Sequence, residues 1–410
     1  MVRKYLRLPF KIARYFLKEM KMVARKVLHQ FESEKELIIL DDIFPHLLSG
    51  FRIAEFNYYL QHIENSAVYS TGAAFKWIYE KRTFDEVKEE YRSYYPASYP
   101  KVFFHNTPYL KAKLFYIVFI ENAYNHLPLI NKNKTAFIFT LYPGGGFRLN
   151  QERSDNMLKT VFANPYFKKV IVTTKVTLEY LINNNFCSRD KIEFVYGVVT
   201  PSGIYENAAT AARRSILEKN SLDICFVSHK YTPQGKDKGY DTFIEVAKKL
   251  KLIHDNIHFH VIGSFNESDI DVDDIKDFIS FYGTLKTHEF SEIYSKMDII
   301  LSPNSSFIMA PGAFDGFPTG ACIEAGLNAV ALFVTDDLKQ NIVFEEDKEI
   351  VIIPRDVNAI VEKINYFYSH PDKLKALGEN GKARIQASYN IDVQMNPRIV
   401  LIQKTLAELS

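Results

Sequence analysis

From about residue 36, short apolar runs alternate with longer amphipathic segments along most of the chain. Runs rich in β-branched and aromatic residues predict strands, and apolar positions every three or four residues predict helices. In the first half, the predicted strands are Leu37–Asp41, Val102–His105, Ala136–Tyr142, Lys169–Thr173 and Ile192–Val195, and the predicted helices cover residues 52–62, 110–125, 152–162 and 175–184. Strands that alternate with helices indicate parallel β-α-β units in an α/β fold.

The alternation stops between Val199 and Ser221, where Pro201, Gly203 and the small residues 208–212 are typical of a linker. It then starts again, with predicted strands Asp223–Val227, His258–Gly263, Ile279–Gly283, Asp298–Ser302, Ala329–Thr335 and Ile350–Pro354, and predicted helices 240–253, 288–296, 320–327, 356–369 and 371–388. A last helix is predicted from about 391 to 408.

We therefore predict two Rossmann-like, doubly wound domains, residues 36–200 and 221–388, connected by a linker at 201–220. The segment 389–410 would form a C-terminal helix that can pack back on the first domain. Ligands of such sheets bind at the carboxyl ends of the strands. In a protein with two such domains, these ends would face each other across a cleft.

Composition narrows the class of protein. The 410 residues include 47% hydrophobic and 24% charged residues, the usual balance of a globular protein. Three separated cysteines, Cys187, Cys225 and Cys322, favour neither a disulfide framework nor a zinc site. No apolar run reaches the roughly 18 residues of a membrane span, and the start of the chain lacks the apolar core of a secretory signal. A cytoplasmic protein is the simplest interpretation.

Basic charge is concentrated at the start of the chain. Residues 1–31 hold nine Lys and Arg and one Glu, a net charge of +8; the whole chain carries only +2, so the remainder carries −6. Basic residues spaced by three and four predict an amphipathic helix whose other face is apolar. We expect residues 1–30 to make peripheral contact with an anionic membrane. The alternatives are docking on its own domain and a nucleic-acid tail, which the acidic remainder disfavours.

The segment Pro311–Leu327 is the richest in candidate chemistry. A predicted strand ends near Ser302, a loop with Gly and Pro follows, and a helix begins at Thr319 or Gly320. Amide groups at a helix N-terminus bind phosphate well. Thr319 is expected to cap this helix, and Glu324, one turn along, could accept hydrogen bonds from ribose hydroxyls.

These residues also carry a family resemblance. Asp315-Gly316-Phe317-Pro318, followed by Glu324-Ala325-Gly326, resembles the donor-binding signature of retaining glycosyltransferases of family four, which have the two-domain GT-B fold. The family has Glu, seven residues, then Glu; here Asp315 comes first and eight residues separate it from Glu324. The resemblance implies that Asp315 contacts the donor sugar, and that the segment Gly316–Gly320 and Glu324 bind the donor.

Other segments resemble the family in the same order. Lys238-Gly239 is similar to the Lys-Gly pair that opens the first helix of the family's C-terminal domain, which implies that Lys238 binds the donor diphosphate. Where the family has Gly-Arg, this chain has His229-Lys230, and either side chain could replace the arginine. In the first domain, Gly50 and Arg52 stand where the family places a loop near the donor phosphates. Tyr142 stands where many members have a histidine.

The resemblance implies retention of anomeric configuration, with Asp315 and Lys238 as catalytic candidates, and with neither a cofactor nor an obligatory metal. The donor would be a nucleotide sugar bound by the second domain. The acceptor would be a glycan or lipid-linked glycan bound by the first domain, in bacterial cell-surface polysaccharide synthesis at the inner face of the membrane. The acidic run Asp269–Asp274 is interpreted as a solvated loop, and Gly144–Gly146 lacks the dinucleotide-binding spacing. A nucleotide-sugar epimerase and an inactive GT-B partner of another transferase remain alternatives.

Overall fold

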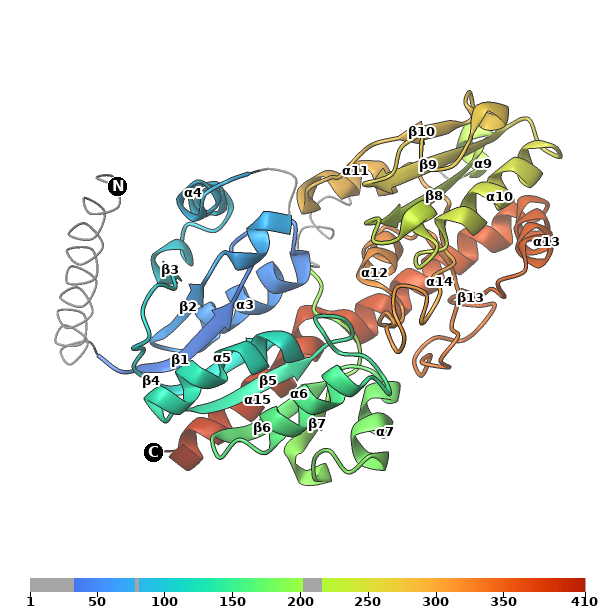
Figure 1. Ribbon diagram of the computed structural model, residues 1–410. Helices are drawn as coiled ribbons and strands as arrows, with labels where there is room; N and C mark the ends of the chain where they lie inside the picture. The colour runs from blue at the N-terminus through green and yellow to red at the C-terminus, as the bar shows by residue number, and fades with distance from the viewer. Residues whose placement is uncertain (1–32, 78–80, 202–215, 410) are drawn as a thin grey trace, which may run out of the picture.

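The computed structural model describes residues 33–77, 81–201 and 216–409, and in them the chain forms two parallel sheets (Figure 1). The first sheet has the order β3-β2-β1-β4-β5-β6-β7. Its strands are β1 (Lys35–Asp41), β2 (Ser66–Ser70), β3 (Val102–Phe104), β4 (Ala112–Val118), β5 (Ala136–Leu141), β6 (Phe167–Val172) and β7 (Ile192–Phe194). The second has the order β10-β9-β8-β11-β12-β13. Its strands are β8 (Leu222–Ser228), β9 (Ile257–Gly263), β10 (Ile279–Phe281), β11 (Ile299–Ser302), β12 (Ala331–Val334) and β13 (Val351–Ile352).

Helices cover both faces of each sheet. In the first domain these are α3 (Gly50–His62), α4 (Phe84–Tyr94), α5 (Ile120–Asn133), α6 (Glu152–Phe162) and α7 (Lys175–Asn183). In the second they are α9 (Ile216–Lys219), α10 (Tyr240–Lys251), α11 (Phe290–Tyr294), α12 (Gly320–Leu327), α13 (Val357–Tyr368) and α14 (Pro371–Tyr389), which is followed by α15 (Ile391–Leu409). Short 3-10 turns lie at Ala73–Trp77, Tyr99–Lys101, Arg189–Lys191, Pro233–Gly235, Asp273–Ile275 and Thr287–Glu289.

Alternating side chains of the central strands build two cores per domain. Leu37 and Ile39 of β1 pack toward α3 and α15, whereas Ile38 and Leu40 pack toward α5, α6 and α7. In the second domain, one core contains α10 and α13 and the other contains α11 and α12, while α14 contributes to both. Both strand orders reverse beside the first strand of the sheet, between β1 and β4 and between β8 and β11, which is where such folds bind ligands. The predicted pair of doubly wound α/β sheets is thus confirmed.

The structure corrects the predicted helix at residues 110–125. Ala112–Val118 is strand β4, paired with β1 and β5 at the centre of the sheet, and α5 begins only at Ile120. A strand that is buried on both faces is apolar at nearly every position, so its sequence lacks the alternation that separates strand from helix. Strand β2 and helix α4 were not predicted. The predicted leader helix and residues 202–215 of the predicted linker lie outside the described residues.

The chain crosses between the domains twice. It leaves the first domain after β7, and α14 of the second domain leads directly into α15, which contacts α3 and β4 of the first domain (Figure 1). At the crossings, Gln394 Nε2 donates to the carbonyl oxygen of Tyr196 at 2.9 Å. A β-carbon on Gly197 would lie 2.4 Å from the ring of Tyr389, so a larger residue does not fit there. In the described ranges, no helix has both the length and the apolar character to cross a membrane.

Candidate active site

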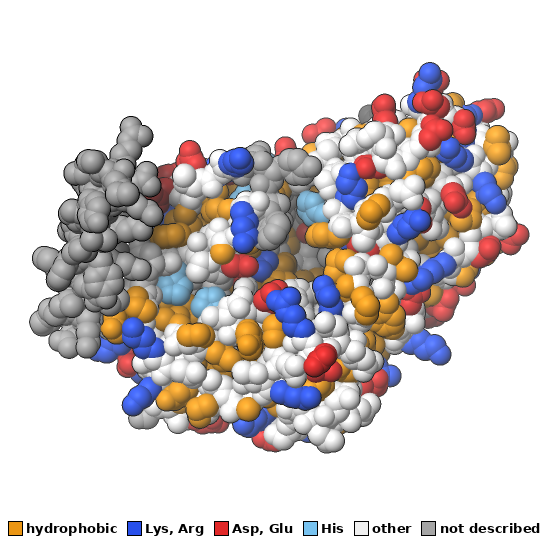
Figure 2. Space-filling model, in the orientation of Figure 1, with side chains coloured by type: hydrophobic (Ala, Val, Ile, Leu, Met, Phe, Trp, Pro, Cys, Tyr) orange, Lys and Arg blue, Asp and Glu red, His pale blue; other side chains and the backbone are white. Residues whose placement is uncertain are grey.

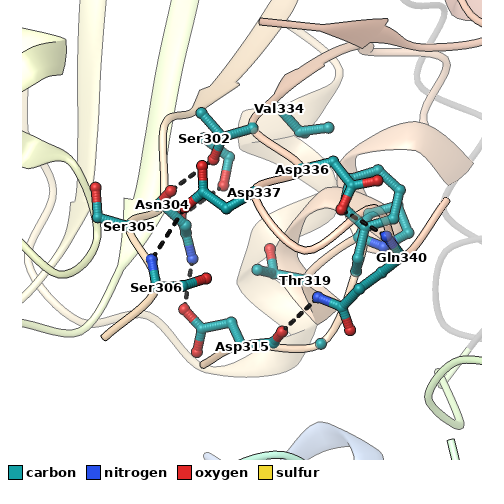
Figure 3. Close-up of a pocket in the computed structure, with 14 residues that line it drawn as sticks. Ser302, Asn304, Ser305, Ser306, Asp315, Thr319, Val334, Asp336, Asp337 and Gln340 are labelled. Carbon is teal, nitrogen blue, oxygen red and sulfur yellow. Dashed lines mark hydrogen bonds between the residues drawn. The ribbon is translucent and has the colours of Figure 1, made fainter. Parts of the chain in front are cut away.

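The loop between β11 and α12 places Asp315 at the centre of the predicted site. Lys238 Nζ donates to both carboxylate oxygens of Asp315 at 2.7 Å, and Asn304 Nδ2 donates to Oδ2 at 2.7 Å (Figure 3 shows the second contact). The Lys238 side chain is 12% exposed and that of Asp315 is 38% exposed. The structure therefore brings together the two residues predicted to be catalytic. Asn304 was not predicted.

Residues near the crossings between the domains hold the backbone of the same loop. Gln340 Nε2 donates to the carbonyl oxygen of Asp315 at 3.1 Å (Figure 3). Tyr196 Oη lies 3.0 Å from the carbonyl oxygens of both Phe317 and Gln340. Because Tyr196 stands at the crossing between the domains, the position of this loop is coupled to that of the crossing.

The N-terminus of α12 differs from the prediction in one detail. Thr319 has the extended backbone of an N-cap residue, but its side chain makes no capping hydrogen bond, and its hydroxyl lies 3.3 Å from Cys322 Sγ. A β-carbon on Gly320 would have no other atom within 4 Å, so open space adjoins the first turn. The positive end of this helix is thus not satisfied by the Thr319 side chain and can accept an anion.

Glu324 of α12 faces the first domain. A β-carbon on Gly50, the first residue of α3, would lie 3.6 Å from Glu324 Oε1 and 3.4 Å from Thr287 Oγ1. Two residues placed in the donor site by sequence therefore come together from opposite domains. A β-carbon on residue 50 would fit at ordinary contact distance, and a longer side chain would narrow this gap.

Arg52 lies close by but points away from the cleft. It is buried, with Nε 2.8 Å from Asp41 Oδ2, Nη1 3.1 Å from Ser49 Oγ and Nη2 3.5 Å from Asp42 Oδ1. Its guanidinium also lies 4.9 Å from the centre of the Phe119 ring. These contacts fix the turn that carries Gly50. They also occupy the guanidinium nitrogens of Arg52, which the sequence analysis placed near the donor phosphates.

The residues that replace the family's arginine have separate surroundings. Lys230 Nζ pairs with Asp269 Oδ1 at 2.6 Å, so part of the acidic run interpreted as solvated contacts a site candidate. Partial desolvation lowers the pKa of His229, and the positive charge of Lys238 lowers it further. His229 is therefore neutral at pH 7 and, unlike an arginine, would bring no charge to a diphosphate.

Aromatic residues form the first-domain wall of the cleft. The rings of Phe51, Phe119 and Tyr142 lie 5.2 to 5.9 Å apart, and together with the Gly316–Gly320 segment they line a cavity of about 180 Å³. Phe119 has φ 70°, unusual for a residue other than glycine, which directs the chain sharply into α5. Sequence reasoning missed Phe119, because this backbone conformation has no signal in its residue type.

The hydroxyl of Tyr142 is turned into the core, although its ring lines the cleft. Its hydroxyl donates to Glu55 Oε2 at 2.9 Å and accepts from Arg398 Nη2 of α15 at 3.3 Å. Glu55 and Arg398 are fully buried. Burial raises the pKa of Glu55, and Arg398 and the hydrogen bonds from Tyr116 and Tyr142 oppose that rise. The side chain at the position of the family's histidine thus belongs to a buried network under the cleft wall.

The domains also touch at the far side of the cleft from the crossings. Lys286 Nζ pairs with Glu90 Oε1 at 2.8 Å, and Thr287 Oγ1 donates to the carbonyl oxygen of Leu47 at 3.0 Å. The cleft is therefore bounded on two sides. Among residues 33–77, 81–201 and 216–409, no three His, Cys, Asp or Glu side chains are grouped closely enough to hold a metal ion.

Comparisons with known proteins identify the architecture. The family model "Glycosyl transferases group 1" matches residues 211–384, which include Lys238, Asp315 and Glu324. No curated protein sequence matches the chain significantly. Among solved structures, HepE of Anabaena in complex with UDP and glucose is 13% identical, with a TM-score of 0.63, over 92% of this chain and 99% of that one. Sucrose-phosphate synthase from Thermosynechococcus elongatus is also 13% identical, with a TM-score of 0.62, over 91% and 100%.

A UDP-forming α,α-trehalose-phosphate synthase from Burkholderia vietnamiensis is 10% identical, with a TM-score of 0.61, over 93% of this chain and 100% of that one. At such identities the structural matches establish the fold, and the family model establishes the type of enzyme. Residues 211–384 therefore form a glycosyl transferases group 1 domain, and the chain is a glycosyltransferase of the GT-B fold that transfers a sugar from a nucleotide sugar.

Proposed function

We propose that the donor lies in the cleft with its diphosphate at Lys238 and at the amides of the first turn of α12. Glu324 accepts hydrogen bonds from the ribose, and Asp315 contacts hydroxyls of the donor sugar. The observation that carries this assignment is the meeting of Lys238, Asp315 and the uncapped end of α12 at one cleft. Gly316, Phe317 and Pro318 would present the loop backbone to the donor.

Transfer requires the bond between the anomeric carbon and the diphosphate to break. Positive charge then develops on the sugar, and negative charge develops on the leaving diphosphate. Lys238 and the α12 amides are fixed before the reaction and stabilise that negative charge, which is the arrangement that lowers a barrier most effectively. The sugar keeps its anomeric configuration, and the closed cleft limits hydrolysis of the donor.

In this proposal Arg52 is a positioning residue. It holds the turn before α3 through Asp41 and Ser49, so Gly50 approaches the donor with its backbone alone. Lys230, held by Asp269, and neutral His229 border the diphosphate and take the place of the family's arginine.

The acceptor in this proposal is a glycan or a lipid-linked glycan of bacterial cell-surface polysaccharide synthesis. The basic residues 1–30 hold the enzyme peripherally at the inner face of the membrane, where such acceptors lie. The +8 charge of residues 1–31 supports membrane contact, since each basic residue near an anionic surface contributes about 1 kcal/mol.

The donor site is tested by nucleotide-dependent thermal stabilisation of the wild type and of Glu324→Ala. A nucleotide at a hundred times its dissociation constant stabilises the folded protein by about 2.7 kcal/mol. We expect one nucleoside diphosphate or its sugar to raise the wild-type melting temperature by several degrees, and Glu324→Ala to lose most of this shift. Glu292→Ala, an exposed glutamate of α11, is the matched control and should keep it.

No shift with any nucleotide would contradict the donor site and favour the inactive-partner alternative. Consumption of the donor without an acceptor, giving an isomeric nucleotide sugar, would favour the epimerase.

Membrane contact is tested by deleting residues 1–30. We expect the wild type to sediment with vesicles that contain anionic lipid and to remain in solution with neutral vesicles. The deletion variant should lose vesicle binding and keep nucleotide stabilisation. Unchanged sedimentation of the deletion variant would refute the proposed role of this segment.

A further inference from the structure

A second cavity, of about 620 Å³, lies in the first domain outside the donor cleft. It is formed where segments after β1, β2 and β3 meet residues of α5 from Asn122 to Lys132. The polar residues that line it include Asp42, His105, Asn106, Asn122, Asn125 and His126. Figure 2 shows histidine side chains in a hollow on this face of the domain. A cavity of this size accommodates a small ligand.

The two histidines present neutral rings. His105 Nε2 lies 2.9 Å from the carbonyl oxygen of Thr107, and His126 Nδ1 lies 2.8 Å from that of Asn122, so these nitrogens carry the protons. Burial lowers the pKa of both residues. Among the residues that the structure describes, none forms a hydrogen bond with the buried His105 Nδ1. An unpaired buried acceptor is unfavourable, and a ligand hydroxyl could pair with it after a small rotation of the ring.

The lining selects the chemical class of ligand. Metal binding is disfavoured, because the described part of the chain offers no group of three suitable ligands. The negative charge of Asp42 disfavours binding of an anion. Lys132 also lines the cavity, but its Nζ lies 4.1 Å from the centre of the Tyr109 ring and is engaged there. Amides, a carboxylate and neutral imidazoles, beside the apolar Leu129, suit an uncharged molecule with many hydroxyls.

The cavity adjoins the cleft without being part of it. Asp42, which lines the cavity, lies 3.5 Å from Arg52, which holds the turn before Gly50. Phe119, which lines the cleft, directly precedes the helix that carries Asn122 and His126. A glycan whose reacting hydroxyl is in the cleft could therefore place another unit here.

We propose that this cavity binds a neutral saccharide unit of the acceptor. The inference rests on the proposed transfer to a glycan, and it assigns to the acceptor a set of residues that the donor site does not use. His105 and Asn106 contact the saccharide, and Asn125 borders its exposed side.

Saturation-transfer NMR of the full chain tests this proposal with four free sugars as probes: D-glucose, D-galactose, N-acetyl-D-glucosamine and L-rhamnose. We expect at least one sugar to receive saturation from the wild type. Its affinity should fall about fivefold in His105→Phe and in Asn106→Ala, the effect of losing about one hydrogen bond. Asn183→Ala replaces an exposed asparagine of α7 and should bind as the wild type does. Asn106 is exposed, so its variant remains informative if His105→Phe does not fold.

Nucleoside diphosphate added at saturation separates the two sites. The sugar signal should persist, because the cavity lies outside the cleft. Loss of the signal would place the sugar in the donor site and overturn the proposal, as would binding unaffected by either variant or no binding by any of the four sugars. Nucleotide stabilisation and its loss in Glu324→Ala test the donor site independently, so failure of one assignment is distinguishable from failure of the other.

Discussion

Lys238→Ala is expected to lower kcat of sugar transfer about 10²–10³-fold, the usual effect of removing one preorganised group that stabilises developing negative charge. Lys238 is 12% exposed and is held by Asp315, so little reorganisation is needed when the diphosphate leaves. Because that charge grows mainly in the transition state, the loss should appear in kcat more than in KM. Steady-state kinetics with the nucleotide sugar found by thermal stabilisation measure both constants.

Lys236→Ala provides the control for Lys238→Ala. Lys236 is exposed and precedes the same helix, so its removal changes the net charge equally without touching Asp315. If the two variants reduce kcat by similar factors, Lys238 acts only through the general positive charge of this region, and the proposed contact with the leaving group is wrong.

Arg398→Ala is expected to destabilise the protein by about 3–5 kcal/mol, because it leaves Glu55 buried without its cation. Glu55 is fully buried, and Arg398 Nε lies 3.9 Å from its Oε1. For a domain of 150–250 residues, each kcal/mol corresponds to about 2–4 °C in melting temperature, so a decrease of roughly 6–20 °C should be seen by calorimetry.

Lys404→Ala, an exposed position on the same helix, should change the melting temperature little. The double variant Glu55→Gln with Arg398→Met removes both charges, and it should recover part of the stability lost by Arg398→Ala. A decrease for Arg398→Ala no greater than that for Lys404→Ala would mean that the buried pair contributes nothing to holding α15 on the first domain.

Local patterns were sufficient to predict the part of the site built from neighbouring residues. Helix α12 begins at Gly320 and ends at Leu327, as its Gly- and Pro-rich approach predicted. The pairing of Lys238 with Asp315 joins residues 77 positions apart. The family resemblance assigned both residues to the donor site, but their contact with each other was not predicted.

Other features depend on the tertiary fold and have no local signal. Asn304 contacts Asp315 because the intervening loop folds back. His105 follows β3, and His126 lies on α5, which follows β4. The two rings come together because β3 and β4 are parallel strands of one sheet, so both segments reach the same edge. Strand β4 was misassigned for a related reason: its central place in the sheet, which determines its apolar composition, is set by pairing with β1 and β5.

The two crossings of the chain determine how the cleft can open. They touch at Tyr196–Gly197 and Tyr389–Gln394, so a rotation of one domain against the other has its axis there. Movement is then greatest at the opposite edge, where the domains are held by the Lys286–Glu90 ion pair and the Thr287 hydrogen bond. These two contacts contribute on the order of 1–2 kcal/mol. The loop before Asp315 is also bound to the first domain, where Leu149 N donates to the carbonyl oxygen of Gly312 at 2.9 Å and Phe314 is buried in the core. We therefore expect the outer edge of the cleft to open for donor entry and for release of the nucleoside diphosphate. The loop that carries Asp315 and Phe317, tied to Tyr196 and to Leu149, should stay near the axis and keep its geometry from one turnover to the next.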